Sequence, residues 1–243
     1  MAEYAPRFAT NAMRSLERSP QRSEKLSQIS ELQEKVSSSL RSVERALERA
    51  AADAGVACAV ERTRDPEAVQ RADKIVVPGQ GAFRDCAAAL GSGLGEAIRA
   101  AIAAGRPYLG ICLGLQVLFD ESDEAPGAAG LGVFRGRVTR LTPSVGVKIP
   151  HMGWNRVTFQ RPDAGPLGVF DSDEPYFYFV HGYHAVPEDP SLIAAITEHG
   201  PHHVTAAVQR DNVTATQFHP EKSQEAGLRL LASFLSDISE RRH

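Results

Sequence analysis

From Leu40 onward, short apolar runs alternate with longer segments whose apolar residues recur every three or four positions. Short apolar runs are typical of buried strands, and the longer spacing is typical of helices with one buried face. The pattern predicts helices at 40–51, 66–72, 85–103 and 226–239. It predicts strands at 57–60, 74–77, 108–111, 133–141, 157–159, 176–180, 194–197, 204–208 and 213–218. This alternation indicates an α/β fold with a mixed, mostly parallel sheet between helices.

The first forty residues follow a different pattern. Residues 27–39 are polar and contain no β-branched run, while an apolar stripe at steps of three and four extends from Leu26 to Leu47. The stripe predicts one long helix, since neither Gly nor Pro interrupts it. Residues 1–22 are basic and poor in apolar side chains, which favours disorder. We therefore expect an atypical N-terminal leader over residues 1–38, helical or disordered, and one domain over 39–243.

Composition narrows the class of protein. At 243 residues with 42% hydrophobic content, the chain can bury one sizeable core. A net charge of −3 gives no reason to expect nucleic acid as a partner. The cysteines show no disulfide or zinc-site spacing, which suits a reducing compartment. No apolar stretch approaches the ~18 residues of a membrane-spanning helix, so we expect a cytoplasmic protein with no membrane partner.

Cys112 is the strongest candidate for chemistry. It follows the apolar run Tyr108–Ile111, is flanked by Gly110 and Gly114, and precedes a helix-prone segment. A cysteine on a sharp strand-to-helix turn exposes its sulfur, and the following helix N-terminus favours the thiolate. Most intracellular cysteines are instead buried packing residues. The two glycines and the change from strand to helix favour a nucleophile over a packing residue.

His219 and Glu221 supply what such a nucleophile needs. An imidazole can take the thiol proton, and a carboxylate can set the imidazole tautomer and stabilise its charged form. Residues two apart share a face in an extended chain, but Pro220 leaves the local geometry open. Because Cys112 lies about a hundred residues upstream, the three groups can meet only through the fold.

These residues carry a family resemblance. Gly110-Ile-Cys-Leu-Gly114 together with His219-Pro-Glu221 resembles the triad, or class I, glutamine amidotransferases. Within that family, four further stretches resemble the glutaminase subunits of imidazole glycerol phosphate synthases. They are Asp73–Phe83, Lys148–Asn155, Tyr178–Tyr183 and Thr216–Ser223. The resemblance covers about residues 40–238 and makes 39–243 a glutamine amidotransferase domain.

The resemblance implies an activity and a partner. Cys112, His219 and Glu221 would form the catalytic triad that hydrolyses L-glutamine to glutamate and ammonia. The ammonia would pass to a separate, barrel-shaped cyclase subunit, forming a heterodimer. That subunit would make imidazole glycerol phosphate and aminoimidazole carboxamide ribonucleotide in histidine biosynthesis. No metal and no organic cofactor is implied.

The resemblance also assigns supporting residues. Oxyanion and glutamine-binding roles fall on Gly79, Gln80, Gly81, Leu113, Gln116, His181, Gly182 and Tyr183. We expect His181–Tyr183 in a loop at a strand exit. Trp154 and Asn155, expected in a loop, and Lys222 would face the partner subunit.

Three features depart from the family pattern. Gln80 stands where the family usually has Val, and Gly182 where it often has Ser or Thr. The apolar first strand and the Asp-Tyr-Gly-x-Gly-Asn turn expected before Leu40 are missing. Two alternatives therefore stay open. The chain could be another triad amidotransferase or a stand-alone cysteine amidohydrolase, or it could be a catalytically impaired subunit that only binds a partner.

Overall fold

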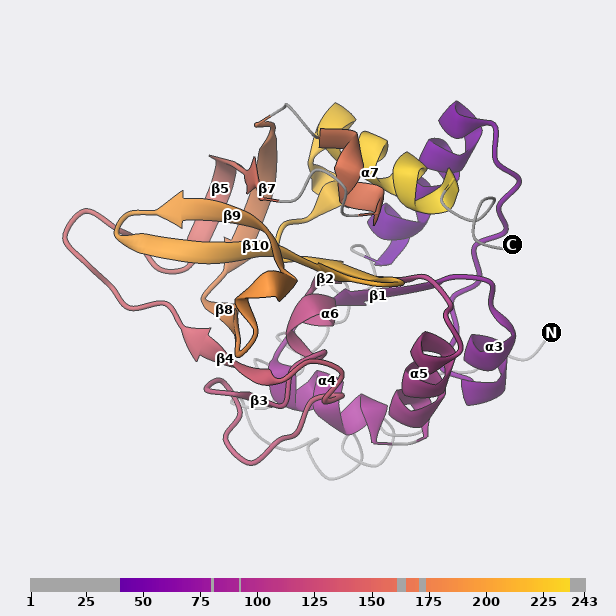
Figure 1. Cartoon of the computed structure of the whole chain (residues 1–243), viewed down its shortest axis with the longest axis horizontal. Helices are drawn as coiled ribbons and strands as arrows, with labels where there is room; N and C mark the ends of the chain where they lie inside the picture. The colour runs from indigo at the N-terminus through magenta and orange to yellow at the C-terminus, as the bar shows by residue number, and fades with distance from the viewer. Residues whose placement is uncertain (1–39, 80, 92, 161–164, 171–173, 237–243) are drawn as a thin grey trace, which may run out of the picture. The chain divides into compact units, whose positions relative to one another are not determined.

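A computed structural model describes residues 40–79, 81–91, 93–160, 165–170 and 174–236 (Figure 1). Ser42–His243 forms one compact unit, and Met1–Arg41 is a second, of which only residues 40 and 41 are described. The N-terminal leader predicted over 1–38 lies outside the described residues. A helix at 40–54 confirms the described part of the predicted long helix.

A six-stranded mixed sheet runs through the second unit, with the strand order β1-β2-β11-β10-β9-β6. The β1–β2 and β2–β11 pairs are parallel, and the other three pairs are antiparallel. The predicted mixed sheet is confirmed, although its antiparallel share is larger than the pattern indicated. The strands are β1 (Ile75–Gly79), β2 (Tyr108–Cys112), β6 (Thr158–Phe159), β9 (Ile193–His199), β10 (His202–Arg210) and β11 (Val213–Thr216).

Two smaller sheets complete the strand structure. One has the order β3-β4-β8, and the other is the antiparallel pair β5–β7. Their strands are β3 (Glu121–Ser122), β4 (Gly136–Arg140), β8 (Tyr183–Pro187), β5 (His151–Arg156) and β7 (Tyr176–His181). Short 3-10 helices occupy Gly165–Phe170 (η1), Pro190–Leu192 (η2) and Pro220–Lys222 (η3). The β5–β7 pair lies across the β9–β10 hairpin, and β5 contacts β9 near the end of that hairpin (Figure 1).

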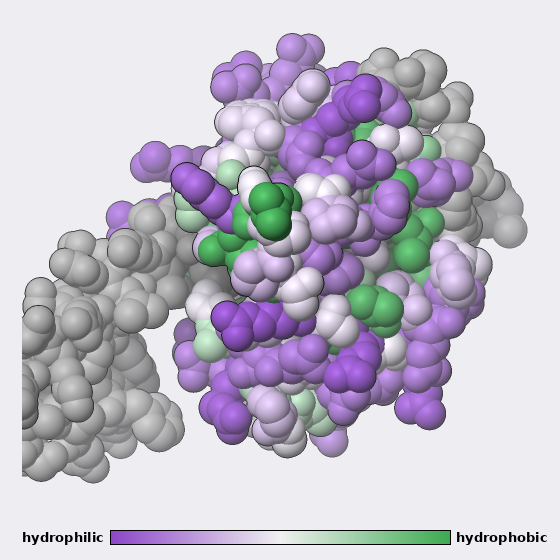
Figure 2. All heavy atoms as spheres, turned by 90° about the vertical axis from the view of Figure 1, so that its left-hand side faces the viewer, coloured by the Kyte–Doolittle hydropathy of each residue, from purple (hydrophilic) through white to green (hydrophobic). Residues whose placement is uncertain are grey.

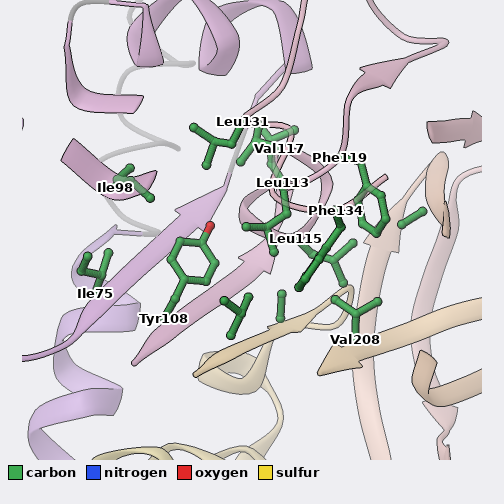
Figure 3. Close-up of a cluster of buried hydrophobic side chains, with 14 of the residues drawn as sticks. Ile75, Ile98, Tyr108, Leu113, Leu115, Val117, Phe119, Leu131, Phe134 and Val208 are labelled. Carbon is green, nitrogen blue, oxygen red and sulfur yellow. The ribbon is translucent and has the colours of Figure 1, made fainter. Parts of the chain in front are cut away.

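Helices cover both faces of the parallel strands (Figure 1). They are α3 (Pro66–Arg71), α4 (Phe83–Leu90), α5 (Leu94–Ala103), α6 (Leu113–Gln116) and α7 (Gln224–Ser236). Alternate residues of β2 point to opposite sides: Tyr108 joins a core with α4, α5 and α6 (Figure 3), while Leu109 and Ile111 join a core with α7 and residues of the 40–54 helix. Because both faces are covered, β2 reads as a continuous apolar run.

Two of the helices and strands predicted from the apolar pattern were wrong. Residues 57–60 form no strand, and Ala57, Cys58 and Ala59 are exposed. β1 lies at one end of the sheet formed by the described strands, so no strand of that sheet pairs with this run and its backbone groups are left to water. The helix predicted at 85–103 is two helices, α4 and α5, because Gly93 between them has a φ of +87°, which a helix cannot contain.

The structure also bears on the predicted absence of a membrane segment. Within the described ranges, no single helix is both long and apolar enough to cross a membrane. Only α4 and α5 taken together reach that length and composition, across a bend of 79°. Both helices contribute buried residues to the core that includes Tyr108, among them Phe83 and Ile98.

Candidate active site

Cys112 sits on a sharp turn between β2 and α6. Its backbone has φ 54° and ψ −102°, and α6 begins at the next residue. A side chain in this region of conformational space costs of order 1–3 kcal/mol and persists only where the surrounding packing enforces it. The predicted strand-to-helix turn is therefore confirmed, and it leaves Cys112 half-buried.

Two glycines allow the turn to pack against β1. A Cβ atom added to Gly114 would lie 1.9 Å from the carbonyl oxygen of Val77, and one added to Gly79 would lie 2.1 Å from the Cβ of Leu113. Backbone therefore contacts backbone at this point, and Gly79 pairs with Cys112 in the strand register. The fully buried Tyr108 also stabilises the turn, since its hydroxyl donates to the Gly114 carbonyl at 2.7 Å.

The second half of the candidate triad lies beside this turn because β11 pairs with β2. Ile111 is opposite Thr216 in the register, and the chain leaves β11 toward His219. His219 Nδ1 lies 2.8 Å from Glu221 Oε1, with the two side chains 2% and 1% exposed. The His219 backbone is fixed by an N–H bond to the Tyr178 carbonyl at 2.9 Å. The structure thus places His219 and Glu221 together despite Pro220.

The electrostatics of His219 depend on its two neighbours. Burial alone would lower the pKa of His219, but hydrogen bonding and charge from Cys112 and Glu221 outweigh it and raise the pKa to about 9. His219 Nε2 and Glu221 Oε2 are buried and have no hydrogen-bond partner of ordinary geometry among the described residues. With Nδ1 engaged by the carboxylate, Nε2 is the ring atom left to exchange a proton with a thiol.

Amide side chains extend the site away from the sulfur. Gln116 Nε2 donates at 3.1 Å to the Tyr183 carbonyl and at 3.1 Å to Gln217 Oε1. Gln217 Nε2 in turn donates to Cys112 Sγ at 3.4 Å. Gln116 and Gln217 are 4% and 0% exposed, so each of these bonds is made in a protected interior.

His181 connects the Tyr183 carbonyl to β5. Its Nδ1 lies 2.9 Å from the Tyr183 oxygen, and its Nε2 lies 3.0 Å from Nδ1 of His151. Burial first, and nearby histidines second, lower the pKa of His181 to about 3 and that of His151 to about 4. Both rings are neutral near pH 7. Residues 181–183 form a tight junction between β7 and β8 rather than the expected loop.

The residues predicted to face a partner lie on a strand rather than in a loop. Trp154 and Met152 are on the outer face of β5, 46% and 62% exposed, and Trp154 pairs with Tyr178 of β7. Lys222 Nζ lies 5.8 Å from the Tyr178 ring centroid. Asn155 points to the opposite face, where its Nδ2 donates to the Glu198 carbonyl at 2.7 Å. Seen from this end of the molecule, hydrophobic side chains are scattered among mostly hydrophilic ones (Figure 2).

The remaining predicted site residues have varied positions. Gln80 lies outside the described residues, and Gly81 beside it is exposed with a φ of +102°. Leu113 is buried and opens α6. Gly182 has room for a side chain, since an added Cβ would meet only Ile149 at 3.9 Å. In the described part of the chain, no group of three or more His, Cys, Asp or Glu side chains could hold a metal ion.

Two residues of the site were not predicted from the sequence. Gln217 was not singled out, although it lies two residues before His219, directly after β11. His151 was not singled out either. Its burial follows from the pairing of β5 with β7, which no local feature of the sequence specifies.

Comparison with known proteins agrees with this geometry. The profile of the family described as glutamine amidotransferase class-I matches residues 36–238. The chain is 45% identical over 203 residues to imidazole glycerol phosphate synthase subunit HisH from Synechococcus sp. (strain JA-3-3Ab), covering 83% of this chain and 90% of that protein. It is 49% identical over 201 residues to the same-named subunit from Syntrophotalea carbinolica, covering 80% and 93%.

Solved structures share the fold at lower identity. One, titled as a crystal structure of glutamine amidotransferase, aligns with a TM-score of 0.60 at 18% identity, covering 81% of this chain and 93% of the other. The glutaminase domain of Trypanosoma brucei CTPS with bound acivicin aligns with a TM-score of 0.56 at 18% identity, covering 82% and 88%. At this identity the likeness establishes the fold alone.

Proposed function

The chain belongs to the class I glutamine amidotransferase family, and from that premise we propose that it is the glutaminase subunit of an imidazole glycerol phosphate synthase. It hydrolyses L-glutamine to glutamate and ammonia for histidine biosynthesis. The identities of 45% and 49% to subunits of that name, over most of both chains, support this assignment. A biosynthetic role of this kind belongs in the cytoplasm.

The first half-reaction uses the triad. His219 Nε2 takes the thiol proton, and the Cys112 sulfur attacks the side-chain amide carbon of glutamine. The C–N bond then breaks, the proton returns from His219 to the departing nitrogen, and ammonia leaves behind a thioester on Cys112. Glu221 keeps Nδ1 engaged, so that Nε2 exchanges the proton and the imidazolium is stabilised.

The second half-reaction releases glutamate. A water molecule attacks the thioester carbon, and His219 takes one of its protons. The C–S bond breaks, His219 returns the proton to Cys112, and the product carboxylic acid departs and gives its remaining proton to the solvent. The negative charge that develops on oxygen in both steps needs backbone donors. The Leu113 N–H is one, because a first-turn amide of α6 has no intrahelical acceptor, and backbone N–H groups of the Gly79–Gly81 segment are the second source.

The other assigned residues bind glutamine and the partner. Gln116 and the backbone of 181–183 hold the amino-acid end of glutamine beside Cys112. Trp154 and Lys222 mark the side that meets a barrel-shaped cyclase subunit, which receives the ammonia and forms imidazole glycerol phosphate and aminoimidazole carboxamide ribonucleotide, and Asn155 supports β5 there from the opposite face. The outer faces of β5 and β7 support this choice, since Met152, Trp154 and Tyr176 are exposed there at 62%, 46% and 58%.

One observation carries the proposal above the rest: the buried His219–Glu221 pair, joined at 2.8 Å, stands beside a strained strand-to-helix cysteine. The test is glutamate release by the purified chain, with and without a barrel cyclase subunit. We expect weak release alone and faster release in the complex. Full activity without any cyclase, and no association with one, would identify a stand-alone amidohydrolase instead. Association without any glutamate release would identify an impaired binding subunit.

A further inference from the structure

The buried side chain of Gln217 directly contacts the nucleophile Cys112, yet the triad chemistry described above gives Gln217 no role. It follows β11, two residues before His219, and none of its surface is exposed. Its backbone N–H donates to the Ala206 carbonyl at 2.8 Å, which ties it to β10. Its side chain reaches across to β2, where Nε2 lies 3.4 Å from Cys112 Sγ.

The orientation of this amide is fixed by its neighbours. The Tyr183 carbonyl can only accept, so the Gln116 atom 3.1 Å from it must be the nitrogen. That nitrogen also lies 3.1 Å from the Gln217 side chain, so the atom it meets there must be the oxygen. The remaining Gln217 atom, which faces the sulfur, is therefore the N–H donor. A reversed Gln217 amide would place two N–H groups against each other.

The far end of this chain of bonds is held as well. Tyr183 O accepts from Gln116 and lies 2.9 Å from Nδ1 of His181, a neutral ring whose Nε2 is engaged by His151. Because the carbonyl can only accept, Nδ1 of the neutral His181 ring carries the proton, and Nε2 accepts from Nδ1 of His151. The Tyr183 carbonyl, which fixes the orientation of Gln116, thus accepts two hydrogen bonds. These bonds also fix the orientation of the Gln217 amide.

From this geometry we propose that Gln217 is a further active-site residue, which donates a hydrogen bond to Cys112 Sγ and stabilises the thiolate, with its orientation set by Gln116. The inference rests on the proposed function, because it deepens the role of the same nucleophile. A hydrogen bond to the charged form of a group favours that form. The donor also restrains the sulfur on the side of β11, toward His219.

The arrangement links glutamine binding to the nucleophile. Gln116 is assigned to the amino-acid end of glutamine, and through Gln217 the same side chain directs the donor at the sulfur. His219, with Glu221 behind it, is the titratable partner of the sulfur, whereas Gln217 contacts the sulfur as a neutral amide, held by the neutral amide of Gln116. Replacing Gln217 therefore changes the hydrogen bonding of the sulfur without touching its base.

The test compares Q217M with the native chain. Methionine is similar in volume but cannot donate. We measure the pH dependence of iodoacetamide modification at Cys112 by peptide mass analysis, because Cys58 is exposed and also reacts. The pH midpoint should rise by about one unit, a tenfold lower thiolate fraction below the midpoint. In the complex, kcat with glutamine should fall about tenfold, with KM changed far less.

A second variant keeps the test decisive if Q217M does not fold. Q217E retains the acceptor for Gln116 but replaces the donor with a carboxyl group, which ionises before a thiol does. A carboxylate beside the sulfur should raise the modification midpoint further than Q217M. The matched control is Q209M, since Gln209 is also a buried glutamine but bonds to Asp211. That control should leave the midpoint unchanged.

A folded Q217M or Q217E variant with the native modification midpoint and the native kcat would overturn the proposal and leave Gln217 as a packing residue. This outcome is separate from failure of the proposed function. Modification of Cys112 is measured without glutamine or a cyclase, whereas the proposed function fails only if the native chain and its complex release no glutamate.

Discussion

The parallel strands around Cys112 and the antiparallel β5–β7 pair present opposite kinds of surface. Around Cys112, glycines bring backbone against backbone, and Gln217 and His219 are 0% and 2% exposed. On the outer face of β5 and β7, Trp154 and Tyr176 are 46% and 58% exposed. In the first region there is no space for a side chain at Gly79 or Gly114. In the second region, large apolar side chains are exposed.

The difference indicates that the packed region around Cys112 holds the catalytic geometry, whereas the exposed face of β5 and β7 is suited to binding another protein. A strained nucleophile persists only where packing enforces its geometry, and the parallel strands supply that packing from both faces. Exposed aromatic side chains are typical of surfaces that bind another protein. His181, at the end of β7, joins the two regions, because the Tyr183 carbonyl that it contacts also accepts from Gln116, but substitutions in each region should have separable effects.

The largest expected effect comes from filling the contact beneath the nucleophile. In Gly114→Ala, the new Cβ would lie 1.9 Å from the Val77 carbonyl oxygen, which is backbone and must move. We expect the free energy of unfolding to fall by about 3 kcal/mol and glutamate release to be lost. Urea denaturation measures the first quantity.

The control for that substitution is Gly182→Ala, whose added Cβ would meet only Ile149 at 3.9 Å. Its free energy of unfolding should stay close to that of the native chain. If Gly114→Ala were as stable as Gly182→Ala, the close contact between β1 and α6 would not constrain the nucleophile.

The next largest effect concerns substitutions at the proposed partner-binding surface. Trp154→Ala should weaken association with the cyclase subunit about thirtyfold, a cost of about 2 kcal/mol for an aromatic side chain at an interface centre. Lys222→Ala should cost less if its ion pair with the partner is exposed. Calorimetry measures both, and the weak glutaminase activity of the free chain should change little for Trp154→Ala.

Val186→Ala is the matched control for the interface, since Val186 is also an exposed apolar strand residue, at 41%, but lies on β8 in the three-stranded sheet. Association should be native in that variant. Native affinity in both Trp154→Ala and Lys222→Ala would remove β5 and η3 from the interface.

A smaller effect concerns protonation inside the packed region. The pKa of His219 is raised to about 9, so the stability contributed by its proton is complete below the unfolded value of about 6.5 and is lost as pH rises toward 9. In Cys112→Ser, the contribution of the thiolate disappears, and His219 should lose its proton at lower pH. NMR titration of the imidazole resolves this, and identical titration curves would show that Cys112 does not act on His219.

The smallest effect concerns the exposed end of the parallel strands. β1 ends the sheet formed by the described strands, and the apolar first strand that the resemblance implies before Leu40 is missing from the sequence. Replacing residues 1–38 with such a strand and an Asp-Tyr-Gly-x-Gly-Asn turn should raise the melting temperature by about 2–4 °C per kcal/mol gained. It should also improve association with the cyclase. A replacement chain no more stable than the original would contradict the expectation that an apolar first strand is missing before Leu40.

The chemistry of the site could be predicted from local sequence because it depends on local features. The strand-to-helix turn at Cys112 follows from apolar residues, glycines and a helix-prone segment in succession. The pairing of His219 with Glu221 could be expected from residue type, but its geometry could not, because the backbone bond from His219 to Tyr178 fixes it from a distant strand.

Other elements depended on partners that the sequence pattern does not specify. Residues 57–60 resemble a strand locally, yet a strand needs a neighbour for its backbone groups. Trp154 and Asn155 were expected in a loop, but they lie on β5, whose pairing with β7 along six residues outweighs the poor strand preference of Gly153 and Asn155. The role of Gln217 became visible only with its contacts to Gln116 and Cys112.

The most direct test of the account is a comparison of nitrogen sources in the complex with a barrel cyclase subunit. Cys112→Ser and His219→Asn should each abolish product formation from glutamine, because the nucleophile or its base is gone. Both should retain synthesis from added ammonia, which bypasses the glutaminase site. Glutamine-dependent synthesis in Cys112→Ser, or loss of ammonia-dependent synthesis in a folded His219→Asn complex, would contradict the account.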